Sequence, residues 1–200
     1  MTQNNNSQLK AKIFQHLQDL SFQPHHTTPL GRRCFRLTGD NDAKVVVKIA
    51  THAQACTALH KEAKVLQHYA LPQMPGFLGM VESFPFAALV MNYAEGREVR
   101  AMDHSLILEN LQEIHGAQLV HCDLKPSNIL VSQTHDVTVL DWEFAAELGT
   151  YISDLERRPF SQGWTHPRLI WGHGKVSPEL DHIFLERLLE TNQQNLPDHR

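Results

Sequence analysis

The amino-acid sequence predicts an α+β fold of two unequal lobes, a β-rich N-lobe with one helix and a reduced, mostly helical C-lobe. Short apolar runs between turn-forming residues fill residues 22–93 around a single helical pattern, whereas helical periodicity dominates beyond residue 105. The 200 residues are 42% hydrophobic and 20% charged, which supports a sizeable core. We therefore expect one domain over residues 1–200, with the N-lobe at about 20–91 and the C-lobe at about 94–191.

The N-terminal elements follow from local patterns. Met1–Ser7 is polar and expected to fray, and Gln8–Leu20 is predicted to be a short amphipathic helix. Phe22–Leu30 and Cys34–Leu37 are predicted strands, and the turn formers of Thr38–Asp42 should close a hairpin before the next strand.

The rest of the predicted N-lobe is a strand, a helix and a strand. Val45–Lys48 is the strand, and Ala53–Tyr69 is the helix. The apolar residues Leu59, Ala63 and Leu66 lie on one face of that helix. Leu89–Tyr93 is the following strand.

In the C-lobe, Ser105–His115 has its apolar residues at helical spacing, and Gly116 is placed to stop the helix. A short strand, Leu119–Val120, follows. Ile129–Val131 and Val137–Leu140 are predicted to pair as a β-hairpin. A loop held between a helix and small strands is rigid enough to fix reactive groups.

That loop carries the most informative residues of the chain. Residues 121–131 are HCDLKPSNILV, and Leu140-Asp141-Trp142-Glu143 follows. Transfer of a phosphoryl group from a nucleotide depends on positioning and charge neutralisation, and these segments supply the groups for both. Asp123 is the candidate base for the acceptor hydroxyl, and Lys125 is a point charge beside the transferring group. Asn128 and Asp141 offer the hard oxygen ligands that Mg²⁺ prefers.

Residues 106–145 resemble the catalytic and metal-binding loops of eukaryotic-type Ser/Thr protein kinases. The resemblance implies a protein-kinase-like fold with a nucleotide cleft, ATP as co-substrate and Mg²⁺ as cofactor. It also implies that Lys48 grips the α- and β-phosphates, oriented by Glu62 14 residues later. The alternative for Lys48 is a solvent-facing lysine at a strand end.

The same resemblance assigns the remaining nucleotide contacts. Met91 is the gatekeeper, and the backbone of Asn92 and Tyr93 hydrogen-bonds the base. Val46 and Leu130 would sandwich the ring. Gly31 lies at the position of the glycine-rich loop that contacts the phosphates in the family. Here it is a single glycine, and Arg32 and Arg33 follow it. The arginines either contact phosphate directly or belong to a surface turn.

Two further departures concern regulation and substrate. Cys122 occupies the position of the arginine that anchors a phosphorylated activation segment, so we expect activity that is independent of phosphorylation at Thr150, Ser153 or Ser161. Asp141-Trp142-Glu143 is similar to the metal loop of aminoglycoside and choline phosphotransferases, which leaves the substrate class open.

The C-terminal segments resemble protein kinases more loosely. Gly163–Leu169 is similar to the end of an activation segment, and Val176–Leu185 to the start of the large central helix. Asp181 would bond the catalytic-loop backbone, and Ile183, Phe184, Leu188 and Leu189 would face the core. We interpret the chain as a minimal, C-terminally truncated member of the family.

Charge and composition limit the classes of binding partner and the cellular location that we expect. A net charge of −4 disfavours a general nucleic-acid surface, and no segment is long and apolar enough to span a bilayer. The three scattered cysteines predict reduced thiols, and the 14 histidines match no zinc spacing, so we expect histidines at the surface or in support of other site residues. The family resemblance makes His121 different, a structural residue that packs and hydrogen-bonds to steady the loop. We predict a cytoplasmic location, with delivery into a host cell as the alternative. The sequence does not indicate an oligomeric state.

The predicted function is an ATP- and Mg²⁺-dependent Ser/Thr protein kinase acting on a protein hydroxyl. One alternative is a small-molecule kinase for sugars or aminoglycosides, suggested by Trp142-Glu143. The other is a nucleotide-binding pseudokinase that serves as an interaction module, suggested by the weak phosphate loop. The sequence identifies neither the acceptor nor the preference for ATP over GTP.

Overall fold

The computed structural model describes residues 2–194, with the surroundings of side chains 7–190. Two compact units divide the chain. The first comprises Met1–Ala70 and Pro75–Ala94, and the second Leu71–Met74 and Glu95–Arg200. The expected α+β class is confirmed, because the first unit is built on an antiparallel sheet and the second mainly on helices and short strands.

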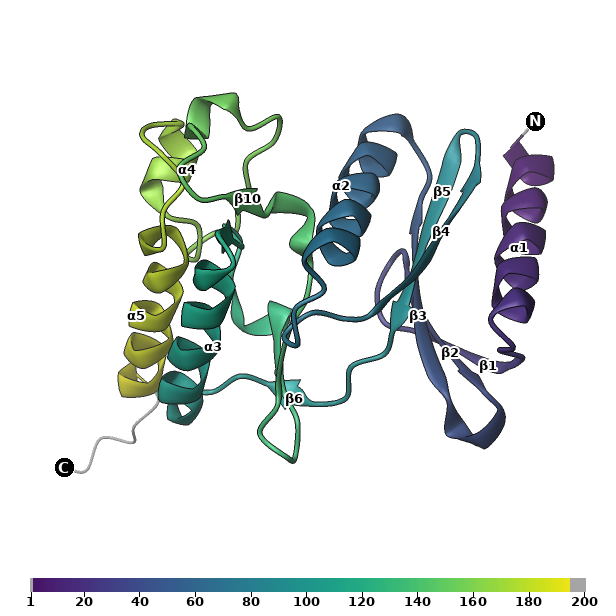
Figure 1. The fold of residues 1–200 in the computed structure, drawn as a ribbon, viewed down its shortest axis with the longest axis horizontal. Helices are drawn as coiled ribbons and strands as arrows, with labels where there is room; N and C mark the ends of the chain where they lie inside the picture. The colour runs from purple at the N-terminus through teal and green to yellow at the C-terminus, as the bar shows by residue number, and fades with distance from the viewer. Residues whose placement is uncertain (1, 195–200) are drawn as a thin grey trace. The chain divides into compact units, whose positions relative to one another are not determined.

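The first unit is a five-stranded antiparallel sheet in the order β1-β2-β3-β5-β4, with a helix on each face (Figure 1). Its elements are α1 (Thr2–Asp19), β1 (Pro24–Pro29), β2 (Cys34–Gly39), β3 (Lys44–Ala50), α2 (Ala53–Tyr69), β4 (Phe77–Ser83) and β5 (Phe86–Asn92). A 3₁₀ turn at Asp40–Asp42 joins β2 to β3, where the turn formers were expected.

Alternation along β3 explains why this strand is apolar on both sides. Val45 and Val47 belong to a buried cluster that includes Leu9, Ile13 and Leu17 of α1. Successive strand residues point to opposite faces, so Lys48 lies on the other face, where it pairs with α2. A strand covered on both faces is expected to be a continuous hydrophobic run.

Helix α1 is longer than predicted. The sequence predicted fraying over Met1–Ser7 and a helix over Gln8–Leu20, whereas the helix begins at Thr2 and ends at Asp19; Met1 lies outside the described residues. No proline or glycine interrupts residues 2–8, and each residue added to an existing helix gains a hydrogen bond. The predicted amphipathic character is confirmed, because Leu9, Ile13 and Leu17 are buried on one face, while Phe14 is 40% exposed.

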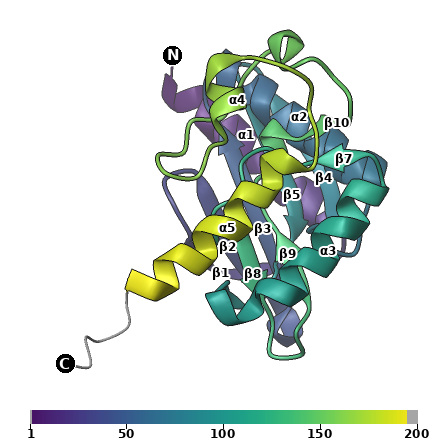
Figure 2. The ribbon, with the colours of Figure 1, turned by 90° about the vertical axis from the view of Figure 1, so that its left-hand side faces the viewer.

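The second unit places helices beside two small sheets. Its elements are β6 (Arg97–Glu98), α3 (His104–Gly116), β7 (Leu119–Val120), β8 (Ile129–Val131), β9 (Val137–Val139), β10 (Ala146–Glu147), α4 (Pro167–Trp171) and α5 (Glu179–Gln194). The sheets are β10-β7 and β6-β8-β9, so the predicted β8–β9 hairpin is confirmed. Helices α3 and α5 pack side by side (Figures 1 and 2).

Two helix details differ from prediction. Gly116 is the last residue of α3, and the residue that turns into the left-handed region is Gln118, with φ 63°. In α5, Phe184 and Leu188 are buried as predicted, but Leu189 is 41% exposed and Ile183 is half-buried. The buried apolar stripe runs through Leu180, Phe184, Leu185 and Leu188, so the predicted stripe was too wide and wrongly included Ile183 and Leu189 at its edges.

The start of α3 is fixed by a buried carboxylate. Asp103 accepts two hydrogen bonds from the Arg97 guanidinium, at 2.7 and 2.8 Å, and one from the Arg100 backbone N–H at 2.8 Å. The Arg97 contact is the main reason that the pKa of Asp103 lies below its ordinary value. Within residues 2–194, no helix is both long and apolar enough to cross a membrane.

Candidate active site

The loop at residues 121–128 is anchored by an acid from a distant helix. Asp181 of α5 is fully buried, and its carboxylate accepts the backbone N–H groups of His121 at 2.9 Å and Cys122 at 2.8 Å. The third partner is the Nε2 of His115, at 3.0 Å. The predicted bond from Asp181 to the loop backbone is therefore confirmed, and a buried charge with three partners is well compensated.

His121 braces the same loop from inside. Its Nδ1 accepts the backbone N–H of Asp123 at 3.2 Å, and its Nε2 lies 2.9 Å from the carbonyl oxygen of Leu140. The Nε2–H tautomer satisfies both contacts. The ring also stacks edge-on against Trp142, with centroids 4.8 Å apart. His121 thus links the loop of Asp123 to the loop of Asp141, which is the structural role predicted for it.

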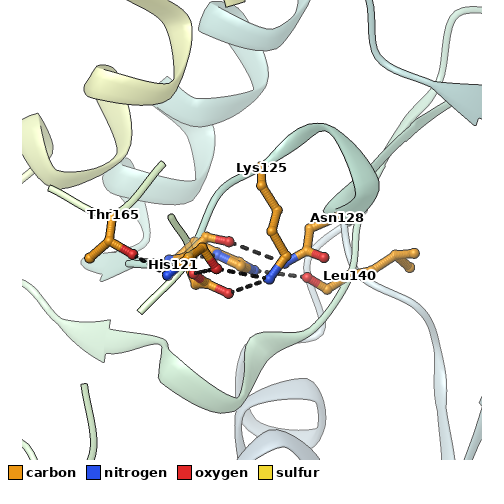
Figure 3. Close-up of polar contacts among 7 residues, drawn as sticks. His121, Lys125, Asn128, Leu140 and Thr165 are labelled. Carbon is orange, nitrogen blue, oxygen red and sulfur yellow. Dashed lines mark hydrogen bonds and ion pairs between the residues drawn. The ribbon is translucent and has the colours of Figure 1, made fainter. Parts of the chain in front are cut away.

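Figure 3 shows Lys125 together with His121 and Asn128 of the same loop. The carboxylate of Asp123 accepts hydrogen bonds from a lysine and a hydroxyl. Lys125 Nζ donates to Oδ2 at 2.8 Å, and Ser161 Oγ donates to Oδ1 at 2.8 Å. Lys125 Nζ also reaches Ser161 Oγ, at 3.2 Å. An oxygen that accepts a hydroxyl at this distance has the geometry required of a general base toward an alcohol.

Ser161 was not among the predicted site residues. Its backbone N–H donates to Thr165 Oγ1 at 2.7 Å, and its carbonyl accepts the Thr165 N–H at 3.0 Å, so the buried Thr165 fixes its position. The contact with Asp123 spans 38 residues. Local periodicity gives no signal for a contact at that separation, because the segment must first fold back over the loop.

The β8–β9 hairpin brings the two predicted metal ligands to one end. Ile129 pairs with Val139, and the Leu140 N–H donates to the Asn128 carbonyl at 2.8 Å, so Asn128 precedes β8 where Asp141 follows β9. The Asn128 side-chain nitrogen donates to the Asp123 carbonyl at 3.1 Å, which orients the amide and leaves its oxygen to face a cation.

This donor set fits a magnesium ion bound together with phosphates. One carboxylate and one amide oxygen are hard ligands that leave coordination positions for phosphate oxygens and water. No group of three or more His, Cys, Asp or Glu residues suited to a metal occurs in the described part of the chain.

The departures at residues 142 and 143 are explained by packing. Trp142 is fully buried, and its Nε1 donates to the Val139 carbonyl at 2.7 Å, so the side chain belongs to the core. Glu143 accepts from Arg157 at 3.2 Å, and the Arg157 guanidinium lies 5.1 Å from the ring centre of Phe144. Arg157 belongs to the segment that follows the metal loop, and its side chain therefore attaches that segment to Glu143 and Phe144.

In the first unit, the predicted Lys48–Glu62 ion pair forms. Lys48 Nζ lies 2.7 Å from Glu62 Oε1, and the Glu62 side chain is only 4% exposed. A carboxylate buried to this degree needs a charged partner, so the Lys48–Glu62 ion pair is an integral contact between β3 and α2. Lys48 is therefore not a solvent-facing lysine at a strand end.

The predicted base-contacting residues of the first unit are neighbours in the sheet. Val46 and Met91 are register partners in β3 and β5, and both are buried. The N–H of Asn92 donates to the Gly76 carbonyl at 2.8 Å, and that of Tyr93 to the Lys44 carbonyl at 3.4 Å. Because both N–H groups are already hydrogen-bonded, a base that contacts these two residues would donate to their carbonyl oxygens.

The remaining predicted residues are less constrained. Leu130 lies in β8 and is half-buried. Gly31 is exposed, and a Cβ added there would meet nothing within 4 Å. Arg33 contacts the His52 ring at 3.2 Å. The structure thus brings Asp123, Lys125, Asn128 and Asp141 together in one unit and Lys48, Glu62, Val46 and Met91 in the other.

Cys122, at the position where the resemblance expects a phosphate-binding arginine, is a buried side chain. The thiol is buried in an apolar cluster with Val120, Ile152 and Leu169. A neutral group packed in this way offers no charge to a phosphate. All three cysteines are free thiols, as predicted.

Comparison with known proteins agrees with this geometry. The model of the protein kinase domain family matches residues 33–184. The serine/threonine-protein kinase nekl-2 of Caenorhabditis elegans is 30% identical over 212 residues, covering 82% of this chain and 56% of that protein. Mitogen-activated protein kinase kinase kinase 17 of Arabidopsis thaliana is 25% identical over 128 residues, 54% of this chain and 34% of the relative.

A probable cyclin-dependent serine/threonine-protein kinase of Dictyostelium discoideum is 32% identical over 75 residues, 38% of this chain and 5% of its own length. The chain therefore spans little more than half of the length of these relatives, or less.

Proposed function

This chain belongs to the protein kinase family, and we propose that it transfers the γ-phosphoryl group of ATP, with Mg²⁺, to a serine or threonine hydroxyl of a protein. The observation that carries the proposal is the Asp123 carboxylate, which holds a serine hydroxyl on one oxygen and the Lys125 ammonium on the other. An acceptor hydroxyl in the place of Ser161 would meet a base and a cation together.

In this mechanism Asp123 orients the acceptor hydroxyl and takes its proton as the new bond to phosphorus forms. Lys125 stabilises the charge on the moving phosphoryl group. Asn128 and Asp141 would hold the metal, which supplies charge neutralisation at the phosphates when it is bound. Because His121 and Asp181 fix the loop, these groups need little rearrangement during the reaction.

Each unit supplies candidate nucleotide contacts, which follow from the family resemblance. Lys48, oriented by Glu62, would contact the phosphates. Val46, Met91 and Leu130 would contact the base, and the carbonyls of Asn92 and Tyr93 would accept from its amino group. Gly31 remains the candidate for a backbone contact to phosphate, although its N–H donates to the Cys34 carbonyl at 3.3 Å and would have to exchange this bond for a phosphate oxygen.

The small-molecule alternative rests on the similarity of Trp142-Glu143 to the metal loop of aminoglycoside and choline phosphotransferases. Trp142 packs in the core and Glu143 pairs with Arg157, so the proposal of a protein acceptor relies on Asp123 and on the similarity to Ser/Thr kinases. The pseudokinase alternative does not account for Asp123, Asn128 and Asp141. A protein that serves only as an interaction module would not need a candidate base beside two candidate metal ligands.

The direct test is phosphoryl transfer from labelled ATP with Mg²⁺ to generic protein acceptors, sugars and aminoglycosides. Asp123→Asn and Asp141→Asn should each lower the rate by about a hundredfold or more. Asp19→Asn is the matched control, because Asp19 is exposed at the end of α1. It should leave the rate unchanged. Label on serine or threonine supports the proposal.

Label on a sugar or an aminoglycoside alone would replace the proposal with the small-molecule function. ATP-induced thermal stabilisation without transfer to any acceptor would replace it with the pseudokinase. Equal rates for the wild type and Asp123→Asn would show that a contaminant causes the activity.

We further propose that activity does not require phosphorylation of the segment after the metal loop. Cys122 provides no phosphate anchor, and the Arg157–Glu143 contact already attaches this segment. Protein treated with a phosphatase, and the Thr150→Ala and Ser153→Ala variants, should keep their rates. A strict requirement for a phosphate at either site would contradict this. Ser161 is unsuitable for this test because it touches Asp123.

A further inference from the structure

A cavity of about 700 Å³ lies between α1 and the sheet of the first unit. Its volume is within the range of about 300–1,000 Å³ that is typical of small-molecule sites. The lining residues are Ser7, Leu9, Lys10, Ile13, Phe14, Leu17, Thr27, Phe35, Leu37, Val47 and Ile49. They belong to α1 and to β1, β2 and β3, on the sheet face opposite Lys48, so the cavity is separate from the proposed nucleotide residues.

The cavity exists because α1 covers only part of the sheet. Lys12 Nζ donates to the Glu82 carbonyl at 2.7 Å, and His16 Nε2 lies 3.1 Å from the Leu78 carbonyl oxygen, so the helix is fastened to β4. The opposite side of α1 faces β1–β3, where Phe35 and Ile49 remain half-buried and Phe14 is 40% exposed. Apolar side chains that face an unfilled space lose contacts that a ligand can restore.

The cavity is polar at one end of the helix. Ser7 and Lys10 lie in the N-terminal half of α1, and the lining residues of α1 that follow them are all apolar. From Ser7 to Leu17 the helix rises about 15 Å, at 1.5 Å per residue. The helix therefore offers a polar end and a long apolar wall to one elongated ligand.

The charge of the lining selects the ligand's head group. Among the described lining residues, Lys10 is the one charged side chain, and no carboxylate is present. The Lys10 ammonium lies 5.8 Å from the centre of the Phe14 ring, at the exposed side of the cavity. A cation beside an apolar wall favours an anionic head with a hydrocarbon tail. A peptide fits less well, because its backbone groups would find few hydrogen-bonding partners there.

We propose that this cavity binds a free medium-chain carboxylate, with its head group at Lys10 and its hydrocarbon chain along Phe14, Phe35 and Ile49. The site is independent of the phosphoryl-transfer residues. It requires α1 to be folded against the sheet, as the burial of Leu9, Ile13 and Leu17 shows.

The test is calorimetric titration of the full chain, stripped of lipid, with decanoate, decanol and decyltrimethylammonium. Decanoate should bind with one-to-one stoichiometry and about tenfold more tightly than decanol, which corresponds to about 1.4 kcal/mol. The cationic amphiphile should bind most weakly. Lys10→Glu should reverse the order of the two charged probes. Lys64→Glu makes the same charge change at an exposed site on α2 and should leave the order unchanged.

A second variant tests the cavity itself. Thr27 is exposed on β1, and tryptophan is favoured in strands, so Thr27→Trp should fill the cavity without disturbing the fold. It should abolish binding of all three probes while the thermal midpoint stays unchanged. Lack of decanoate binding by the wild type, or binding that survives Thr27→Trp, would overturn the proposal. Equal affinity for decanoate and decanol would overturn the role of Lys10.

Sedimentation with phosphatidylcholine–phosphatidylglycerol vesicles distinguishes a free ligand from a membrane. The wild-type chain should stay in the supernatant. Vesicle binding that is lost in Thr27→Trp would mean that the cavity takes the acyl chain of a membrane lipid, and the proposal of a free carboxylate would be wrong.

Discussion

The catalytic loop at residues 121–128 and the β1–β2 loop around Gly31 are built very differently. In the catalytic loop, Asp181 and His121 hold the backbone through buried hydrogen bonds. In the β1–β2 loop, Gly31 has open space around it, and the Arg33 side chain has one exposed contact, with His52. The groups proposed to do chemistry are therefore fixed by buried side chains, whereas the loop proposed to cover phosphate is held by two hairpin hydrogen bonds, from the Leu30 and Gly31 N–H groups to the Cys34 carbonyl.

This contrast predicts that substitutions in the two regions differ sharply in effect. The largest effect is expected at Asp181. Asp181→Ala removes the acceptor of two backbone N–H groups and a histidine, and leaves these donors buried without a partner. We expect the free energy of unfolding to fall by about 3–5 kcal/mol. Urea denaturation followed by circular dichroism measures this loss.

A smaller, local loss for Asp181→Ala would mean that the loop is held by other contacts. The control is Asp154→Ala, an exposed acid of the same unit, for which we expect a change within about 0.5 kcal/mol.

The second effect concerns the ion pair of the first unit. Glu62→Gln keeps the shape of the side chain but removes the charge opposite Lys48. If Lys48 contacts the phosphates, the variant should raise the KM for ATP by about tenfold and leave acceptor binding unchanged. Steady-state kinetics with varied ATP measures both. A fall in stability with an unchanged KM would assign the pair to folding alone.

The third effect is a pH dependence at the start of α3. Because the Arg97 guanidinium lowers the pKa of Asp103 in the folded state, the unfolded state binds this proton more readily. The stabilisation is full above the ordinary pKa of aspartate and is lost as the pH falls through the lowered value. Thermal midpoints of the wild type and Asp103→Asn should therefore differ at neutral pH and converge in acid. A difference that is constant with pH would contradict the ionic origin.

The smallest effect is expected at Gly31. Its backbone is not in the left-handed region, and an added Cβ meets nothing within 4 Å, so Gly31→Ala should fold normally. If the loop closes over phosphates only loosely, the KM for ATP should change by less than about threefold, against about tenfold for Glu62→Gln. A loss as large as that of Glu62→Gln would show that the loop closes tightly over the nucleotide.

The parts of the molecule that sequence could predict are those encoded in short segments. The β8–β9 hairpin, the limits of α2 and the closeness of Asn128 to Asp141 follow from patterns within about twenty residues. The bond between Asp181 and the catalytic loop spans about sixty residues, and it was predicted through family resemblance rather than through periodicity.

Contacts that depend on long-range packing escaped prediction. The position of Ser161 on Asp123 and the cavity beneath α1 both depend on how distant segments meet. The error at Leu189 has another origin, because a helix with apolar residues at adjacent positions does not define its own phase until it is packed.

The anchoring of the catalytic loop by α5 has a consequence for biosynthesis. A ribosome adds residues in order, so His121 and Cys122 leave the exit tunnel well before Asp181 is incorporated. Until Asp181 has been added to the nascent chain, the backbone N–H groups of His121 and Cys122 have no carboxylate to bind, and the loop is not yet anchored. The loop that carries Asp123 is therefore secured only after the helix that holds Asp181 has been translated.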